Sequence, residues 1–208
     1  MHAAWASGWP LAAVARVRGS SDSVPGRART CWSDCLLTAR APGALTLTEA
    51  ERRVLAAWAA DCAERALKLF EAQTADDARP RDAIEGARAF ARGALGVGAA
   101  RTLAARAHAA ARAAGAPAAG AAARAAGHAA AVAHMAGHAV GAPAYAALAA
   151  RLARPGDTAA ADKACRWAVR HATPGVRAIM RRLPKRTNHG GDLGALVYRL
   201  QQELTARV

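Results

Sequence analysis

The chain has 208 residues, of which 53% are apolar and only 4% aromatic, and it carries a formal charge of +14 at neutral pH. This apolar content is too high for an intrinsically disordered chain, and the length suits one ordinary domain with a tail. Most of the apolar residues are alanine, the strongest helix former, and runs of β-branched or aromatic residues are absent. The composition therefore predicts an all-α fold, a single alanine-rich bundle of about seven to eight helices.

The positive charge raises the hypothesis of nucleic-acid binding, because clustered cations bind phosphates and release counterions. However, nearly all of the basic residues are arginine, and GC-rich coding alone produces a joint excess of Arg, Ala, Gly and Pro. The excess of basic residues is greatest in residues 151–208, which hold 12 basic and 4 acidic residues. A nucleic-acid-binding protein is therefore an alternative, and its candidate residues are Arg177, Arg181, Arg182, Lys185 and Arg186.

Residues 1–43 are rich in Gly, Ser, Pro and Trp and predict a poorly ordered or atypical N-terminal extension, followed by a helical domain over residues 44–208. Two of the four cysteines, Cys31 and Cys35, lie in this extension, without the second pair of ligands that a zinc site needs. No stretch is apolar enough to span a membrane, and no charged region precedes an apolar segment as in a signal peptide. We therefore expect a cytoplasmic protein without a membrane partner.

The helical domain begins at a capping box, Thr48-x-x-Glu51, which is followed by a long helix. Its apolar stripe includes Trp58 and Cys62, and Cys62 and Cys165 are expected to be buried thiols in a reducing cytoplasm. Capping residues, prolines and glycines divide the rest of the chain in the same way. Further helices are predicted over residues 79–92, 99–114, 117–140, 144–153, 159–171, 174–183 and 192–206.

Four stretches carry a resemblance to a known family. They are Trp58-Ala-Ala-Asp-Cys-Ala-Glu64, Arg79-Pro-Arg81 with Ile84-Glu85-x-x-Arg88, the alanine- and histidine-rich run to Tyr145, and Gly190-Gly-x-Leu-Gly-Ala195. They resemble a bacterial family of immunity proteins, the Imm-five-like family, over about residues 45–208. The resemblance implies an all-helical domain encoded beside toxin or specialised-metabolite genes. It also implies a self-resistance protein whose partner is a cognate toxin or a small-molecule ligand, which it binds and neutralises.

Three histidines fall within the predicted helix over residues 117–140. His134 and His138 are one turn apart on the same face, a spacing at which two imidazoles can share a metal, whereas His128 points about 120° away. The glutamate of a His-Glu-x-x-His motif is absent, and this helix contains no carboxylate. We therefore predict no metal and no cofactor, and expect a buried, hydrogen-bonded histidine cluster at the centre of the bundle.

The remaining alternative is a small-molecule enzyme of specialised metabolism with a histidine/carboxylate acid–base pocket. Carboxylates and histidines inside an apolar bundle can shift one another's pKa values far enough for proton transfer near neutral pH. The catalytic candidates are Glu85, His134 and His138, and the binding candidates are Asp61, Glu64, Arg81, Arg88, His108 and His128. Because alanine buries little area, the core is thin, and a homodimer is one expected way to gain stability.

Overall fold

A computed structural model describes residues 47–157, 159–188 and 190–206. The predicted extension over residues 1–43, with Cys31 and Cys35, lies outside the described residues. Within them the protein is all-α, as the composition predicts, with eight α-helices, one short 3₁₀-helix and no strand. The helices are α1 (Glu49–Glu71), α2 (Arg79–Ala91), α3 (Val97–Ala113), α4 (Pro117–Ala131), α5 (Gly141–Leu152), α6 (Ala160–Arg170), α7 (Pro174–Arg182) and α8 (Gly191–Thr205), and the 3₁₀-helix η2 (Ala136–His138) precedes α5.

The first helix begins where the capping box predicts. The Thr48 hydroxyl accepts a hydrogen bond from the Glu51 backbone N–H, and the Glu51 carboxylate accepts one from the Thr48 N–H at 2.8 Å. This reciprocal pair satisfies two of the donors that a helix start leaves free. The indole of Trp58, which is 4% exposed, donates to the Ala168 carbonyl oxygen at 3.0 Å and thereby joins α1 to α6.

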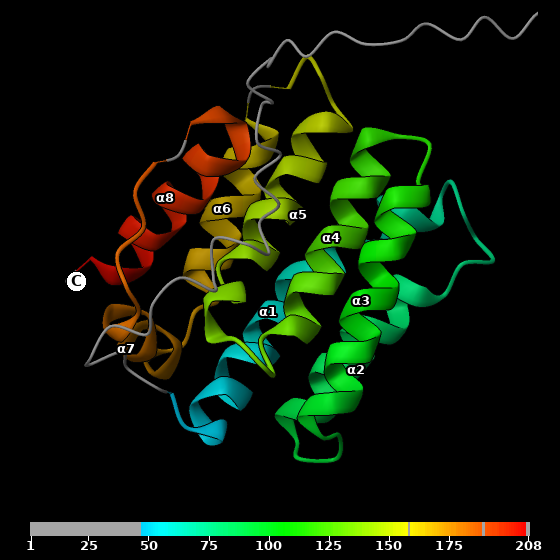
Figure 1. The fold of residues 1–208 in the computed structure, drawn as a ribbon. Helices are drawn as coiled ribbons and strands as arrows, with labels where there is room; N and C mark the ends of the chain where they lie inside the picture. The colour runs from blue at the N-terminus through cyan, green and yellow to red at the C-terminus, as the bar shows by residue number, and fades with distance from the viewer. Residues whose placement is uncertain (1–46, 158, 189, 207–208) are drawn as a thin grey trace, which may run out of the picture. The chain divides into compact units, whose positions relative to one another are not determined.

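The helix α4 is the central element of the bundle and packs against α1, α2, α3 and α5. Figure 1 shows α3, α4 and α5 side by side, with α1 and α2 behind them. From Ala119 to Ala131, every residue of α4 except Arg124 is buried, and all of them apart from Arg124 and His128 are Ala or Gly. A helix that is apolar all round belongs inside a protein, and its small side chains let the neighbouring helices approach closely.

Alanine also supplies most of the buried apolar residues of the whole core, and larger side chains such as Phe70, Phe90 and Leu200 fill the spaces between helices. Among the described helices, none has the length and apolarity that a membrane span requires. Both Cys62 and Cys165 are buried free thiols, as predicted. Burial away from water raises the pKa of each thiol, that of Cys165 to about 11, so neither is a thiolate near neutral pH.

Candidate functional site

The chain reverses direction after α4, and this reversal builds the candidate site. The sequence predicts one helix over residues 117–140, and that prediction is wrong, because α4 ends at Ala131 and η2 and α5 follow. His134 lies in the turn and His138 lies at the end of η2, so they do not share a helix face as predicted.

Two arginines that are far away in the sequence donate hydrogen bonds to backbone carbonyls of this reversal. Arg52 of α1 donates from Nε to the Ala133 carbonyl oxygen at 3.0 Å. Arg186, in the segment before α8, donates from Nη2 to the Gly137 carbonyl oxygen at 2.9 Å. The last carbonyls of α4 bind the turn itself, since Ala130 accepts from the Ala133 N–H and Ala131 accepts from the Met135 N–H. The two arginines therefore bind carbonyls of the turn and of η2, and they tie the segment after α4 to residues far away in the sequence.

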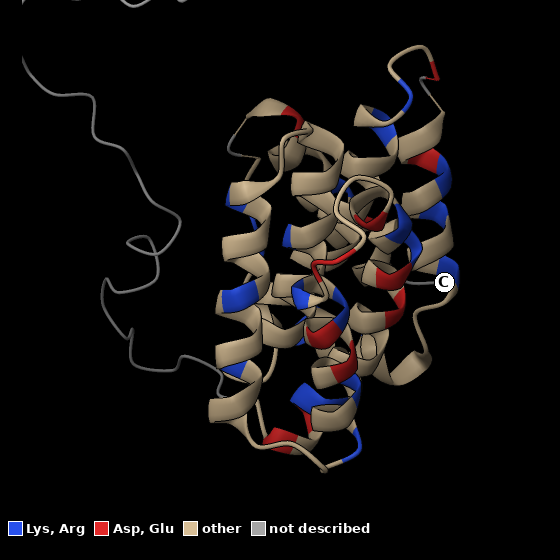
Figure 2. Ribbon diagram, turned by 90° about the vertical axis from the view of Figure 1, so that its right-hand side faces the viewer, with Lys and Arg blue, Asp and Glu red and all other residues tan. Residues whose placement is uncertain are grey.

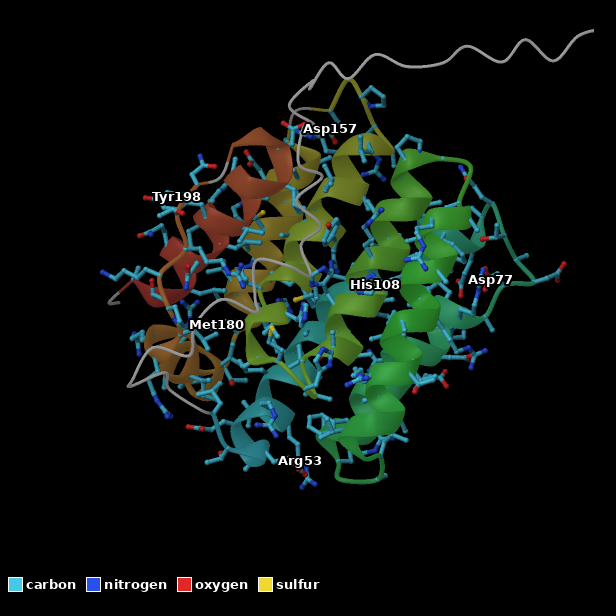
Figure 3. The ribbon with its side chains drawn as sticks, in the orientation of Figure 1. Arg53, Asp77, His108, Asp157, Met180 and Tyr198 are labelled. Atoms are coloured by element: carbon cyan, nitrogen blue, oxygen red, sulfur yellow. The ribbon has the colours of Figure 1, made fainter. Side chains whose placement is uncertain are left out.

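Four histidines gather around the reversal: His108 of α3, His128 of α4, His134 and His138. We call them the histidine cluster. The Nδ1 atoms of His128 and His138 lie 3.1 Å apart, within hydrogen-bond distance. The His108 ring meets the His128 ring edge-on with centroids 5.4 Å apart, and His134 lies 5.5 Å from His138. Figure 3 labels His108 in the middle of the bundle, on α3.

Glycines make room for the rings of His108 and His128. A Cβ atom added at Gly127 would lie 2.7 Å from the His108 ring, and one added at Gly141 would lie 2.4 Å from Nδ1 of His128. The rings therefore pack directly on the backbones of α4 and α5. The Tyr145 ring completes the enclosure of His128, with its centroid 4.9 Å from that of the imidazole.

The surroundings of the cluster favour neutral imidazoles. Burial lowers the pKa of all four histidines, that of His138 to about 4 and that of His128 well below its ordinary value. Neighbouring arginines add to this effect: Arg124 on His108 and His128, Arg186 on His128 and His138. In the hydrogen-bonded pair one neutral ring donates and the other accepts, because a neutral imidazole has one N–H group and one free nitrogen.

The described residues include no group of three or more His, Cys, Asp or Glu side chains placed to hold a metal ion. The carboxylates among the predicted site residues lie elsewhere. On the outer face of α1 and α2, Arg88 donates to Asp61 at 3.0 Å and to Glu64 at 3.2 Å. Arg81 forms an ion pair with Glu71, and Glu85 is exposed on α2. The predicted site residues therefore divide into a histidine cluster and an α1–α2 ion-pair group.

The charges are distributed unevenly. Figure 2 shows basic and acidic residues interleaved over part of the bundle, whereas the helix at the left edge of that view, α3, carries basic residues and no acidic ones. On α3, Arg106 lies 3.7 Å from Asp82. Arg101, Arg112 and the half-buried Arg124 of α4 have no carboxylate partner within the described ranges. The amino-acid sequence alone does not single out these arginines, because a cation without a partner is recognised only when its neighbours are placed.

The C-terminal basic residues have mixed roles. Arg177 donates to the Val169 carbonyl oxygen at 2.6 Å, Arg182 pairs with Glu51, and Arg186 holds the reversal. Of the five nucleic-acid candidates, Arg181, Arg182 and Lys185 are exposed, and Arg182 is paired with Glu51. Most of these basic residues therefore stabilise contacts among α1, α6, α7 and the chain reversal.

Comparison with known proteins gives one match. The model of the family described as Imm-5 like putative immunity protein matches residues 45–174, which include α1 to α6 and the whole histidine cluster. The match ends at Pro174, the first residue of α7, so it is shorter than the resemblance predicted over residues 45–208. No curated protein and no solved structure matches the chain.

Proposed function

The chain belongs to the Imm-5-like family of immunity proteins, and we propose that it protects its host by binding a cognate toxin and blocking its action. Family membership over residues 45–174 supports a toxin as the partner. One observation indicates where the docking surface lies: among the described residues, three arginines on α3 and α4 have no carboxylate partner. The family thus implies a toxin as the partner, and the arginines on α3 and α4 indicate the surface that binds it.

The arginines Arg101, Arg112 and Arg124 form what we call the arginine face. They lie near the histidine cluster, so their positive charges add to burial in lowering the pKa of His134, through Arg101, and of His108, through Arg124 and Arg112. Arg101 and Arg112 are exposed, and they point in nearly the same direction because 11 residues are close to three helical turns. A surface with unpaired cations attracts an acidic partner and speeds its association.

The histidine cluster lies between the helices that carry the arginine face and keeps them in place. The neutral rings of His108 and His128 fill the space between α3, α4 and α5 without adding charge, and their packing on glycines fixes α3 against α4, whereas His134 is exposed in the turn. The neutral rings also avoid repulsion beneath the arginine face. We therefore assign the cluster a positioning role and not a role in proton transfer.

The enzyme alternative has no contact to support it in the described part of the chain. Its acid–base pair needs a carboxylate at Glu85 within reach of His134 or His138, and Glu85 lies exposed on α2. The carboxylates of Asp61 and Glu64 already pair with Arg88. Binding, rather than catalysis, is therefore the function that the arrangement of charges supports.

The test uses the toxin encoded nearest to this gene. A strain without the gene should be inhibited by that toxin, and the wild-type protein should restore growth. The double variant Arg101→Glu/Arg112→Glu should fail to restore it and should bind the purified toxin at least tenfold more weakly at low salt. A matched double variant, Arg92→Glu/Arg170→Glu, reverses two exposed arginines outside the arginine face and should protect like the wild type.

The salt dependence separates charge complementarity from misfolding. The difference in affinity between wild type and the double variant should shrink in about 1 M salt, where charges are screened over a few ångströms. Circular dichroism should be the same for all variants. Full protection by the Arg101→Glu/Arg112→Glu variant would contradict the proposed surface. Protection without any complex between this chain and the toxin would contradict toxin binding itself.

A further inference from the structure

A cavity of about 380 Å³ lies on the other side of α5 from the histidine cluster. Its walls come from α1, α5 and α6, and both α1 and α6 pack against α5. The labels of Figure 1 let the reader follow these three helices. Protein pockets for small molecules have volumes of roughly 300 to 1,000 Å³, so this cavity has the size of a ligand site.

The floor of the cavity is apolar. Alanines from all three helices line it together with Leu69, Pro143 and Trp167. The hydrogen bond from Trp58 to the Ala168 carbonyl oxygen ties α1 to α6 beside it. Because alanine side chains are short, the helices meet along α5 but leave a space between α1 and α6.

The Trp167 wall is held rigidly in place. The guanidinium carbon of Arg65 lies 4.4 Å from the centroid of the Trp167 ring. The His171 ring stacks on the same indole, with centroids 3.8 Å apart and an angle of 18° between the planes. His171 also donates from Nδ1 to the Trp167 carbonyl oxygen at 2.9 Å. A wall fixed in this way loses little conformational entropy when a ligand binds.

The polar part of the lining is cationic. Four basic residues contribute to it, namely Arg65, Lys68, Arg154 and Lys163, and the described lining residues include no Asp or Glu. Lys163 lies 3.7 Å from the Asp157 carboxylate, whereas Lys68 and Arg154 have no carboxylate partner in the described ranges. An apolar floor with unpaired cations is complementary to a molecule that has an apolar body and a negative charge.

We propose that the cavity between α1, α5 and α6 binds a small amphipathic organic anion. The apolar body of the ligand lies against the alanines and Trp167, and its acidic group lies between Lys68, Arg65 and Arg154. The site is separate from the arginine face, so the small ligand and a toxin would contact different helix faces. The proposal therefore stands or fails independently of the proposed toxin binding.

The experiment uses the full chain and two probes of the same shape, 2-naphthoate and the uncharged 2-naphthamide. Isothermal titration calorimetry should show at least tenfold tighter binding of 2-naphthoate than of 2-naphthamide. The double variant Arg65→Gln/Lys68→Gln should lose at least tenfold in affinity for 2-naphthoate and little for 2-naphthamide. The matched double variant Arg92→Gln/Arg170→Gln removes two exposed cations that do not line the cavity and should bind both probes like the wild type.

Cavity-filling variants test the position of the site. Ala164→Leu and Ala150→Leu each place a larger apolar side chain in the cavity, so the thermal unfolding midpoint should stay the same or rise while both probes lose binding. Equal affinity for the two probes would overturn the role of the cations. Undiminished binding to both filled variants, or no binding of 2-naphthoate at millimolar concentration, would overturn the cavity as a ligand site.

Discussion

Acid should destabilise the folded protein at a pH well above the range in which carboxylates titrate. The perturbation is protonation of His138. Burial lowers the pKa of its imidazole from 6.5 to about 4. The neighbours that oppose its positive charge are His134, His108 and Arg186. His128 lies within hydrogen-bond distance of the same ring. Among the described residues no carboxylate is one of these neighbours, so no negative charge compensates a positive charge on the ring.

The sign follows from proton binding in the two states. A histidine whose pKa is lower when folded leaves the protein most stable above the unfolded value, and stability falls as the pH drops below about 6.5. Between about pH 7.5 and pH 5, His138 alone should remove about 2 kcal/mol from the free energy of unfolding. The lowered pKa values of His108, His128 and His134 act in the same direction.

The assay is urea unfolding followed by circular dichroism at the two pH values. With a slope of about 2 kcal/mol per molar for a domain of this size, the urea midpoint should fall by about 1 M or more at the lower pH. The variant His138→Gln should lose much of this pH dependence. The matched variant His171→Gln changes an exposed histidine outside the cluster and should keep it. Equal midpoints at both pH values, or the same pH dependence in His138→Gln, would refute the reasoning.

Three further changes should alter the free energy of unfolding. Gly141→Ala places a Cβ atom 2.4 Å from the His128 ring and should cost about 1–3 kcal/mol in chemical unfolding, whereas Gly98→Ala, with open space around it, should be neutral or stabilising. Trp58→Phe removes the hydrogen bond between α1 and α6 and should cost about 1–3 kcal/mol by the same measurement. Thr48→Ala removes the capping box and should lower the free energy of unfolding by about 1 kcal/mol; an unchanged thermal midpoint would contradict that role.

Local signals in the sequence predict most of the fold. Thr48 and Glu51 mark the start of α1, Pro117 marks the start of α4, and Pro174 marks the start of α7. These signals work because capping and proline placement involve residues within one turn of each other. The structure places each of these helix starts within one or two residues of the predicted position.

The end of α4 could not be predicted in this way. Residues 132–135, Val-Ala-His-Met, contain no glycine or proline, and alanine-rich sequence favours a continued helix. Just after the helix ends, Arg52 and Arg186 donate to the carbonyl oxygens of Ala133 and Gly137 from 81 and 49 residues away. Helix propensity is a weak preference that tertiary contacts override, and only a placed backbone shows which contacts those are.

The same limit applies to the candidate site. All four histidines of the cluster are among the predicted site residues. Helical spacing, however, predicts that His134 and His138 lie together on one helix face. The structure instead pairs His128 with His138 across the reversal. The glycine directly before His128 is the signal that sequence reasoning missed, since a glycine at the centre of a buried helix indicates a close approach by another group. Gly127 provides that approach for the ring of His108.

The alanine-rich core explains why the bundle has two different sites on opposite faces of α5. Gly141 and Tyr145 face the histidine cluster, whereas Pro143, Ala146 and Ala150 line the cavity. Helices with short side chains cannot fill every space between them, because alanine contributes little volume. On one face imidazole rings occupy the space, and on the other face the space is left as a cavity. The histidine cluster and the cavity share α5 but no lining residue. The pH dependence of unfolding that arises from the histidine cluster can therefore serve as a folding control for every cavity variant.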